Sequence, residues 1–382
     1  MRSVGLDLGA RHIAYCEVCD GKVVERTSVQ QIEQLKGRLG PGTLPAIVAF
    51  EAAREAWFVH DLLRTWGHEP KIVDTTRLKT IGIGHHKRKN DALDAEHLAI
   101  AVEQGRIPEA HVLSVEGREL REQLSVRQAL VETRAGYVTT IRGLARAHGK
   151  RVATCDISNF VTHLEATEMN PGLQKLVAPL AAMLKVLDEQ LVRVEEKLQN
   201  LAGRDPRIRL CATAPGIGLI VGATFMSVMD DAHRFKNAHA VSAYLGLVPS
   251  ESTTGGPSKR RLGGITKQGN PHARAMLVQA AHSLLRTRKH AGDPIRLWGM
   301  NIAKKKGRSI AAVAVARRLA GVLWAMCRDG AFYDPNTATK GTFQKKSMRG
   351  SDETQRTVAL RRATKKLQRR YTRRKTSEVT MT

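Results

Sequence analysis

The sequence predicts an α/β N-terminal domain, a long helical arm and a mainly helical C-terminal domain. Three strand-like runs at the N-terminus are followed by alternating strands and helices, a pattern typical of a mixed sheet covered by helices. Two long segments with apolar residues every three or four positions come next, and a region rich in small residues follows them. We therefore expect domains over residues 1–112, 113–204 and 205–330, and a basic, disordered tail over residues 331–382.

Hydrophobic periodicity and turn residues predict the elements of the first domain. Asp20-Gly21 is a strong hairpin signal between two strand-like runs. The predicted strands cover residues 3–8, 12–18, 22–29, 46–50 and 71–74, and the predicted helices cover residues 52–66 and 91–104.

Two long amphipathic helices are predicted over residues 114–149 and 173–201. They form either a projecting or dimerising coiled-coil arm or an ordinary helical hairpin folded on the same chain. Residues 205–209 are interpreted as a linker, and residues 210–329 as a compact helix-rich domain.

The charge balance points to a nucleic-acid partner. The chain has 382 residues, with 62 Lys and Arg against 36 Asp and Glu, and a formal net charge of +26. Such an excess favours binding to a polyanion, and nucleic acid is the commonest one. No apolar run is judged long enough to cross a membrane and no signal sequence is recognised, so we expect a cytoplasmic protein without membrane contact. Five scattered cysteines indicate no disulfide framework, and the Cys16–Cys19 pair has no matching second pair for zinc.

Four acids stand out by their position. Asp7 lies in the first strand, Glu51 ends the fourth, and Asp91 and Asp94 open a helix, where positions i and i+3 share one face. Acids at adjacent strand ends and at a nearby helix start can converge, and a divalent metal such as Mg²⁺ would offset their mutual repulsion. Each acid alone also has a structural explanation, as a turn, cap or first-turn charge. Their order in a basic protein favours a metal site for phosphodiester chemistry.

These segments resemble the DEDD motif of a family of insertion-sequence transposases that includes pilin-gene invertases and RNA-guided bridge recombinases. The segments are VGLDLG, AFEAAREAW and KNDALDAEHLA, and residues 214–218, 245–249 and 263–270 resemble the same family's C-terminal transposase domain. The resemblance spans about residues 2–330. It implies a RuvC-like, ribonuclease-H-type N-terminal domain that uses Mg²⁺.

The resemblance also implies a serine nucleophile in the C-terminal domain, which forms a covalent intermediate with DNA. Thr254 occupies that position in this chain. A threonine hydroxyl can be a nucleophile, but its branch methyl restricts the rotamer. Ser252 or Ser258 would take the role if the loop is shifted, and an impaired protein is the other alternative.

Basic residues around this loop are the expected phosphate contacts. They are Lys259, Arg260, Arg261, Lys267 and Arg274, with His272 beside them. Residues 215–218, Pro-Gly-Ile-Gly, resemble the hairpin of a helix-hairpin-helix, and a simple turn explains them equally well.

The leading functional prediction is a DNA transposase or site-specific recombinase. The resemblance implies an element-encoded guide RNA as a further partner, since base pairing would then read the sequence. Synapsis needs more than one subunit, so a homodimer or homotetramer is expected. The alternatives are a RuvC-like DNA nuclease without a covalent intermediate, and a basic nucleic-acid-binding protein without catalysis.

Overall fold

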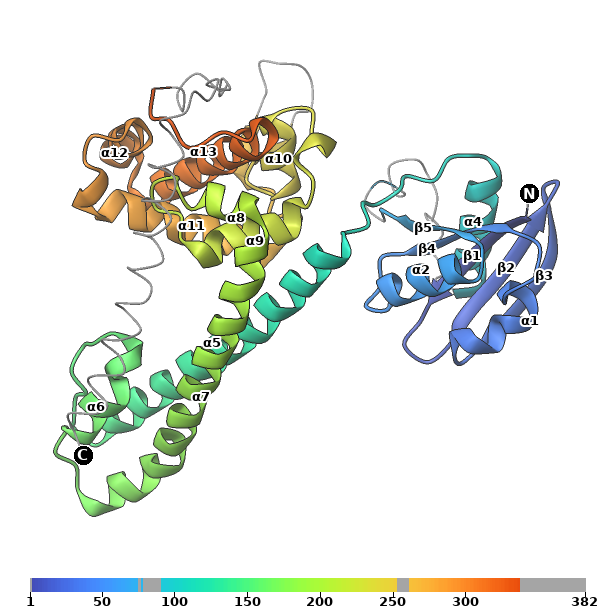
Figure 1. Ribbon diagram of the computed structural model, residues 1–382. Helices are drawn as coiled ribbons and strands as arrows, with labels where there is room; N and C mark the ends of the chain where they lie inside the picture. Colours follow the sequence, from blue (N-terminus) through green and yellow to red (C-terminus); the bar gives the residue numbers. More distant parts are fainter. Residues whose placement is uncertain (1, 75–76, 78–90, 253–260, 337–382) are drawn as a thin grey trace. The chain divides into compact units, whose positions relative to one another are not determined.

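The computed structural model describes residues 2–74, 77, 91–252 and 261–336 (Figure 1). The chain divides into two compact units, Met1–Leu113 and Ser114–Thr382. The first unit is built on a sheet and the second is almost entirely helical. Thr254, Ser258, Lys259, Arg260 and most of the predicted tail lie outside the described residues.

The first unit contains a mixed five-stranded sheet. Its strands are β1 (Arg2–Leu8), β2 (Ile13–Cys19), β3 (Lys22–Val29), β4 (Ala46–Glu51) and β5 (Glu69–Val73), in the order β3-β2-β1-β4-β5. β2 is antiparallel to both β1 and β3, whereas β4 is parallel to both β1 and β5. This order and these directions are consistent with the expected ribonuclease-H-like fold.

Helices cover both faces of this sheet. The helices α1 (Lys36–Leu39) and α2 (Ala56–Thr65) and the 3₁₀ turn Ile32–Leu35 close one apolar core, which includes Val4, Leu6, Val48 and Phe50. The opposite face is covered by α4 (Asp91–Glu103), which packs on Ala14, Cys16, Ala49 and Val73. Because strand side chains alternate between faces, the two cores use alternate residues of the same strands.

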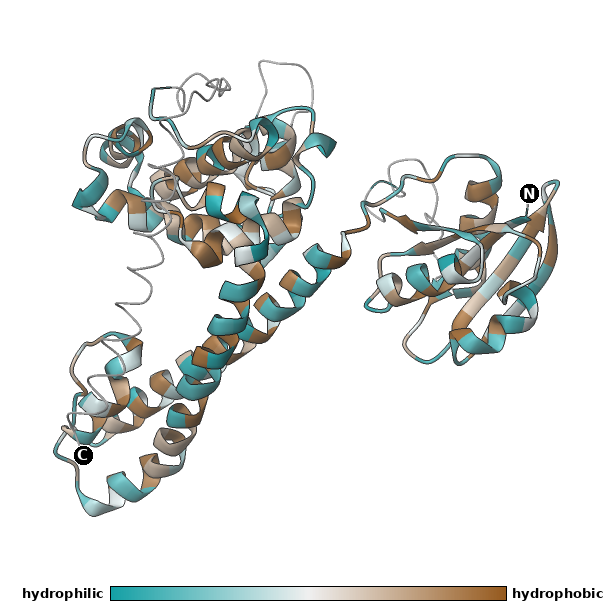
Figure 2. Cartoon of the chain, viewed as in Figure 1, coloured by the Kyte–Doolittle hydropathy of each residue, from teal (hydrophilic) through white to brown (hydrophobic). Residues whose placement is uncertain are grey.

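The predicted pair of long helices is present as α5 (Val115–Ala147) and α7 (Pro171–Arg204), which pack against each other. The pair Arg127–Glu195 (2.8 Å) and the pair Arg134–Asp188 (2.6 Å) link the two helices. At one end the hairpin has its own core around Phe160 of α6 (Phe160–Glu165). At the other end Leu120, Leu124, Leu198 and Ala202 join the core of the helices that follow. Hydrophilic and hydrophobic residues alternate along both helices (Figure 2).

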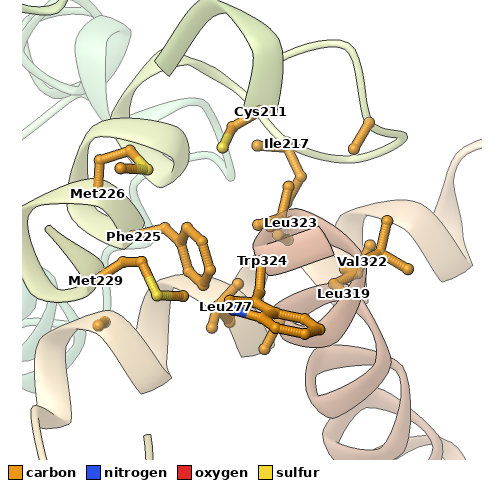
Figure 3. Close-up of a cluster of buried hydrophobic side chains, with 14 of the residues drawn as sticks. Cys211, Ile217, Phe225, Met226, Met229, Leu277, Leu319, Val322, Leu323 and Trp324 are labelled. Carbon is orange, nitrogen blue, oxygen red and sulfur yellow. The ribbon is translucent and has the colours of Figure 1, made fainter. Parts of the chain in front are cut away.

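The remaining helices enclose one apolar core. They are α8 (Pro206–Cys211), α9 (Leu219–Met229), α10 (Ala238–Tyr244), α11 (Pro271–Arg286), α12 (Pro294–Lys306) and α13 (Arg308–Asp329). Phe225, Leu277, Leu323 and Trp324 meet at its centre (Figure 3). A two-stranded hairpin, β6 (Pro249–Ser252) and β7 (Arg261–Ile265), interrupts the helices between α10 and α11.

Two local expectations were wrong. Residues 205–209 are not a linker, because Asp205 caps α8 by accepting a hydrogen bond from the Arg207 amide at 2.8 Å. The expectation that no apolar run is long enough to cross a membrane was also wrong. Within the described part of the chain, α13 is long and apolar enough to do so. However, 61% of the apolar stretch of this helix is buried, and the helix supplies many residues of the core of the second unit. A buried core helix satisfies the same test of length and composition.

Candidate active site

Asp7 and Glu51 lie beside each other at the carboxyl ends of two parallel strands. The parallel register of β1 and β4 pairs Leu6 with Phe50, and Asp7 and Glu51 are the next residues along the two strands. Neighbouring strands are about 4.8 Å apart. Two acids separated by 44 positions in the chain are therefore brought together by strand pairing.

Both acidic side chains lie on the face of the sheet that α4 covers. Asp7 shares its face with Gly5, and Glu51 shares its face with Ala49, because alternate residues of a strand point the same way. Ala49 packs on α4, and a Cβ atom placed on Gly5 would lie only 1.9 Å from the carbonyl oxygen of Ala95 in α4. The helix therefore crosses β1 in backbone contact at the position two residues before Asp7.

The other two predicted acids stand in the first turn of this helix. A Cβ atom placed on Gly9 would lie 3.8 Å from Oδ2 of Asp91, so the Asp91 carboxylate reaches the turn that follows Asp7. Asp94 directly precedes Ala95, the residue that lies over Gly5. Asp91 and Glu51 are exposed, and Asp7 and Asp94 are half-buried. The four acids thus come from three elements and lie around one edge of the sheet.

The four acids do not form a closed cage. Among the residues for which coordinates are described, no three His, Cys, Asp or Glu side chains lie close enough together to hold a metal ion. The donor chemistry nevertheless fits Mg²⁺, which prefers carboxylate oxygens and keeps several positions for water and phosphate. Metal binding by Asp7, Glu51, Asp91 and Asp94 stays a prediction.

The predicted nucleophile belongs to residues 253–260, which lie between β6 and β7 in the chain and outside the described residues. Ser252 pairs with Arg261 at one end of the hairpin, and residues 253–260 connect the two strands. At the other end the Ser250 hydroxyl donates to the Gly264 carbonyl at 3.0 Å, and the Thr266 amide donates to the Val248 carbonyl at 2.9 Å. Thr254 therefore follows a paired strand by two residues.

The described basic residues near this hairpin differ in their surroundings. Arg261 and Lys267 are exposed, and Lys267 has a positive φ of 57°. Arg274 is half-buried, and its Nη1 donates to the carbonyls of Leu245 (3.2 Å) and Gln268 (2.9 Å). Arg274 thus links the residues after α10 to the loop after β7. Contact of Arg261, Lys267 or Arg274 with phosphate stays a prediction.

His272 adds no positive charge near neutral pH. Burial lowers the pKa of its imidazole below the usual value of 6.5, and the nearby Arg127 guanidinium lowers it further. The imidazole is therefore neutral at pH 7, which weakens its case as a phosphate contact.

The Pro215–Gly218 segment forms the connection between α8 and α9. Gly216 has a φ of +79°, which favours glycine, and a Cβ atom there would lie 2.9 Å from the carbonyl oxygen of Ala280 in α11. The close approach to α11 explains this glycine structurally. The helix–turn–helix order is compatible with both a helix-hairpin-helix and a simple turn.

Sequence reasoning missed Gly5, which supports the site without contributing a functional group. The signal was available, since an isolated glycine within a strand often marks a close backbone approach. It also missed the cluster of Arg234, Phe235 and Tyr244, in which Arg234 Cζ lies 4.7 Å from the centroid of the Phe235 ring. Two aromatic residues nine positions apart gave no periodic signal.

Comparison with known proteins agrees with this arrangement of an acid-bearing sheet followed by helices. Residues 4–148 match a family model of DEDD transposases, and residues 208–295 match the model described as transposase IS116/IS110/IS902 family. The chain is therefore a transposase, an enzyme of DNA strand transfer. It belongs to the IS116/IS110/IS902 family of insertion-sequence transposases.

Relatives from several bacteria extend the similarity over most of the chain. A putative transposase of Sinorhizobium fredii is 30% identical over 76% of this chain and 75% of its own length. A probable family 20 transposase of Pseudomonas aeruginosa is 28% identical over 76% of this chain and 86% of its own length. The transposase for insertion sequence element IS1328 of Yersinia enterocolitica is 27% identical over 86% of this chain and 98% of its own length.

Proposed function

We propose that this chain cuts and rejoins DNA with the acids of a RuvC-like, ribonuclease-H-type domain and a hydroxyl nucleophile of the C-terminal domain. The observation that carries the proposal is that Asp7 and Glu51 directly follow the paired residues Leu6 and Phe50 on the face that α4 covers, and that the first turn of α4 carries Asp91 and Asp94. Four acids around one edge of the sheet, in a protein of net charge +26, favour phosphate chemistry over nucleic-acid binding without catalysis.

Asp7, Glu51, Asp91 and Asp94 would hold Mg²⁺. The bound ion would supply positive charge to the attacked phosphate and to the oxygen that leaves it. The residues themselves contribute hard oxygen donors on rigid elements, namely two strand ends and a helix start. The strand order β3-β2-β1-β4-β5 supports a ribonuclease-H-type domain.

Thr254 is the proposed nucleophile. Its Oγ1 would form a new bond to phosphorus while one bond from phosphorus to a DNA oxygen breaks, and the departing DNA oxygen would take up the hydroxyl proton. Lys259, Arg260, Arg261, Lys267 and Arg274 would hold the adjoining phosphates. Ser252 and Ser258 remain the alternative nucleophiles on the same connection.

The partners follow from the same chemistry. DNA is the substrate, an element-encoded guide RNA would select the sites, and the chain would act in the cytoplasm as a homodimer or homotetramer. We propose that the α5–α7 hairpin is a coiled-coil arm, distinct from a C-terminal domain over residues 205–330, and that it makes the subunit contacts.

Replacing acids with amides tests the acidic half of the site. We expect Asp7→Asn or Asp91→Asn to lower DNA cleavage and strand transfer by at least about a hundredfold, because a lost ligand or charge weakens metal catalysis. DNA binding should be retained. Asp20→Asn is the matched control, because Asp20 is an exposed turn residue of the same unit. Equal activity of Asp7→Asn and Asp20→Asn would contradict the proposal.

Trapping a covalent adduct tests the nucleophile. The full chain is incubated with DNA carrying the element's ends, its RNA and Mg²⁺, and a protein–DNA adduct is mapped by mass spectrometry. Loss of the adduct in Thr254→Ala but not in Ser252→Ala supports Thr254. Higher activity in Thr254→Ser than in the parent chain would fit the same assignment, since serine lacks the crowding methyl group.

The replacement of the expected serine by Thr254 favours one competing function, a nuclease of the same fold. Such an enzyme would release free 3′-hydroxyl and 5′-phosphate ends without an adduct. A basic protein without catalysis predicts instead that Asp91→Ala leaves every reaction unchanged.

A further inference from the structure

A guanidinium group and two aromatic rings form a compact cluster on the second unit. Arg234 Cζ lies 4.7 Å from the ring centroid of Phe235 and 4.8 Å from that of Tyr244. The two rings contact each other edge to face, with their centroids 5.3 Å apart and an angle of 62° between their planes. We call Arg234, Phe235 and Tyr244 the aromatic platform.

The platform is fixed to the interior of the unit. The buried Trp324 indole donates from Nε1 to the carbonyl of Ala232 at 2.8 Å, two residues before Arg234. Arg234 Nη1 itself donates to the carbonyl of Met229 at 3.3 Å. A platform held in this way loses little conformational entropy when a ligand binds to it.

The outer part of the platform faces solvent and is basic. Tyr244 is 41% exposed, although the chain contains only 4% aromatic residues. Lys236 and His239, which lie between Phe235 and Tyr244 in the chain, are both exposed. An exposed aromatic ring beside the Arg234 guanidinium suits a ligand that combines a flat π surface with negative charge.

The platform also adjoins the base of the β6–β7 hairpin. A Cβ atom placed on Gly269 would lie 2.0 Å from the carbonyl oxygen of Tyr244, so the loop after β7 packs on the end of α10. The Lys267 amide donates to the Gly246 carbonyl at 3.1 Å and ties the same loop to the residues after Tyr244. The platform therefore adjoins the end of the hairpin at which Pro249 pairs with Ile265.

We propose that Tyr244, supported by Arg234 and Phe235, stacks on an unpaired base of the DNA strand that is being cut. Every nucleobase has a π face that can stack on an aromatic ring, and an adjacent guanidinium adds a cation for the ring and the phosphate. The proposed nucleophile lies between β6 and β7 in the chain, and the loop after β7 packs on Tyr244, so we assign the stacked base to the strand that is cut. The identification of that strand as the one being cut rests on the proposed function. The stacking of a base on Tyr244 does not depend on it.

Binding measurements with defined duplexes test the platform. The probes are two DNA duplexes of one sequence, one fully paired and one with a single unpaired 2-aminopurine, and the protein is the full chain carrying Asp7→Asn. We expect Tyr244→Leu to weaken binding to the duplex with the unpaired base about tenfold and to change binding to the paired duplex by less than about twofold. Tyr244→Phe should restore the binding, because it keeps the ring.

A spectroscopic readout separates stacking from a general loss of structure. Fluorescence of the unpaired 2-aminopurine should be quenched by the parent chain and by Tyr244→Phe, but not by Tyr244→Leu. Phe332→Leu is the matched control, because Phe332 is 47% exposed on the same unit and outside the platform. Equal weakening on both duplexes, or quenching that persists in Tyr244→Leu, would overturn the proposal.

A third probe distinguishes DNA from RNA. An RNA strand of the same sequence is tested alongside the DNA, and a loss of binding confined to RNA would overturn the assignment to the cut strand. The use of Asp7→Asn keeps the test independent of cleavage. Stacking without any cleavage by the parent chain would refute the proposed function alone, whereas cleavage without stacking would refute only the platform.

Discussion

The absence of a side chain at Gly5 allows α4 to pack closely on β1, although Gly5 itself contributes no group to the candidate site. α4 crosses β1 at this residue, with the Ala95 carbonyl 1.9 Å from the place where a Cβ atom would stand. Backbone atoms of a helix cannot move aside like the end of a flexible side chain. The first turn of α4, with Asp91 and Asp94, can therefore keep its position relative to Asp7 only if residue 5 has no Cβ atom.

Gly5→Ala should destabilise the first unit by about 2 kcal/mol, because overpacking in a close-packed core costs roughly 1–3 kcal/mol. Strand-transfer activity should fall as well, since α4 must shift. Urea unfolding of the full chain, followed by tryptophan fluorescence, measures the effect. Gly37→Ala is the control, because a Cβ atom there meets nothing within 4 Å. Equal stabilities of the two variants would contradict this explanation.

The Glu17 carboxylate predicts how the first unit responds to acid. Arg2 donates to it from Nε at 2.7 Å and from Nη2 at 2.8 Å, and the Tyr15 hydroxyl donates at 2.6 Å. The hydrogen bonds from Arg2 hold the pKa of Glu17 below its usual value, and the bond from Tyr15 acts in the same direction, although burial opposes both.

Because the folded state lowers the pKa of Glu17, its contribution to stability is present above the unfolded pKa of about 4.3 and is lost as the pH falls through the folded pKa. The difference in melting temperature between the parent chain and Glu17→Gln should therefore be largest near about pH 6 and should shrink below about pH 4. Thermal unfolding across this range measures it. A constant difference between the two proteins would show that Glu17 does not titrate in this way.

At the scale of elements, the start of α5 depends on a short polar network. The Ser114 hydroxyl accepts from the Gly117 amide at 3.1 Å and donates to Oδ1 of Asp230 at 2.6 Å. The Ser114 amide donates to Oδ2 of the same carboxylate at 3.0 Å. One residue thus caps the long helix and joins it to the end of α9.

Ser114→Ala should cost about 1 kcal/mol of stability, since loss of an N-cap side chain typically costs roughly 0.5–2 kcal/mol. Denaturant unfolding of the second unit measures the loss. Ser125→Ala is the matched control on the same helix, because the exposed Ser125 hydroxyl bonds to the Arg121 carbonyl one turn earlier and caps no helix. A loss in Ser125→Ala as large as that in Ser114→Ala would contradict a role for the cap.

For the whole molecule, charge sets the strength of DNA binding. Over residues 337–382 there are 14 Lys and Arg but only 3 Asp and Glu, so these residues carry a large part of the net charge of +26. Lys and Arg that neutralise phosphates release counterions when they bind.

Replacing the paired basic residues between Arg361 and Lys375 with Gln should make DNA binding less sensitive to salt. The slope of log K against log salt should become shallower by about 0.9 for each phosphate that the tail no longer neutralises. Affinity for unrelated duplexes, measured between about 50 and 200 mM salt, gives this slope. An unchanged slope would mean that the tail does not bind DNA.

Local patterns in the chain were sufficient to predict much of this protein. Alternating and helical periodicity located the five strands, α4 and the two long helices to within a few residues, because burial on one face requires those periods. Net charge indicated a polyanionic partner. The motif around Asp7, Glu51, Asp91 and Asp94 indicated the family, which the comparisons confirm.

Contacts between distant parts of the chain determine three features that no local sequence pattern could predict. The placement of Asp7 next to Glu51, the close crossing at Gly5 and the assembly of Arg234, Phe235 and Tyr244 all depend on contacts between elements that are separate in the chain. The sequence analysis interprets residues 205–209 as a linker because the six residues of α8 are too few to show a period, although Asp205 followed by Pro206 is a helix-start signal. Periodicity reports which face of an element is buried, but packing alone determines which other element buries it.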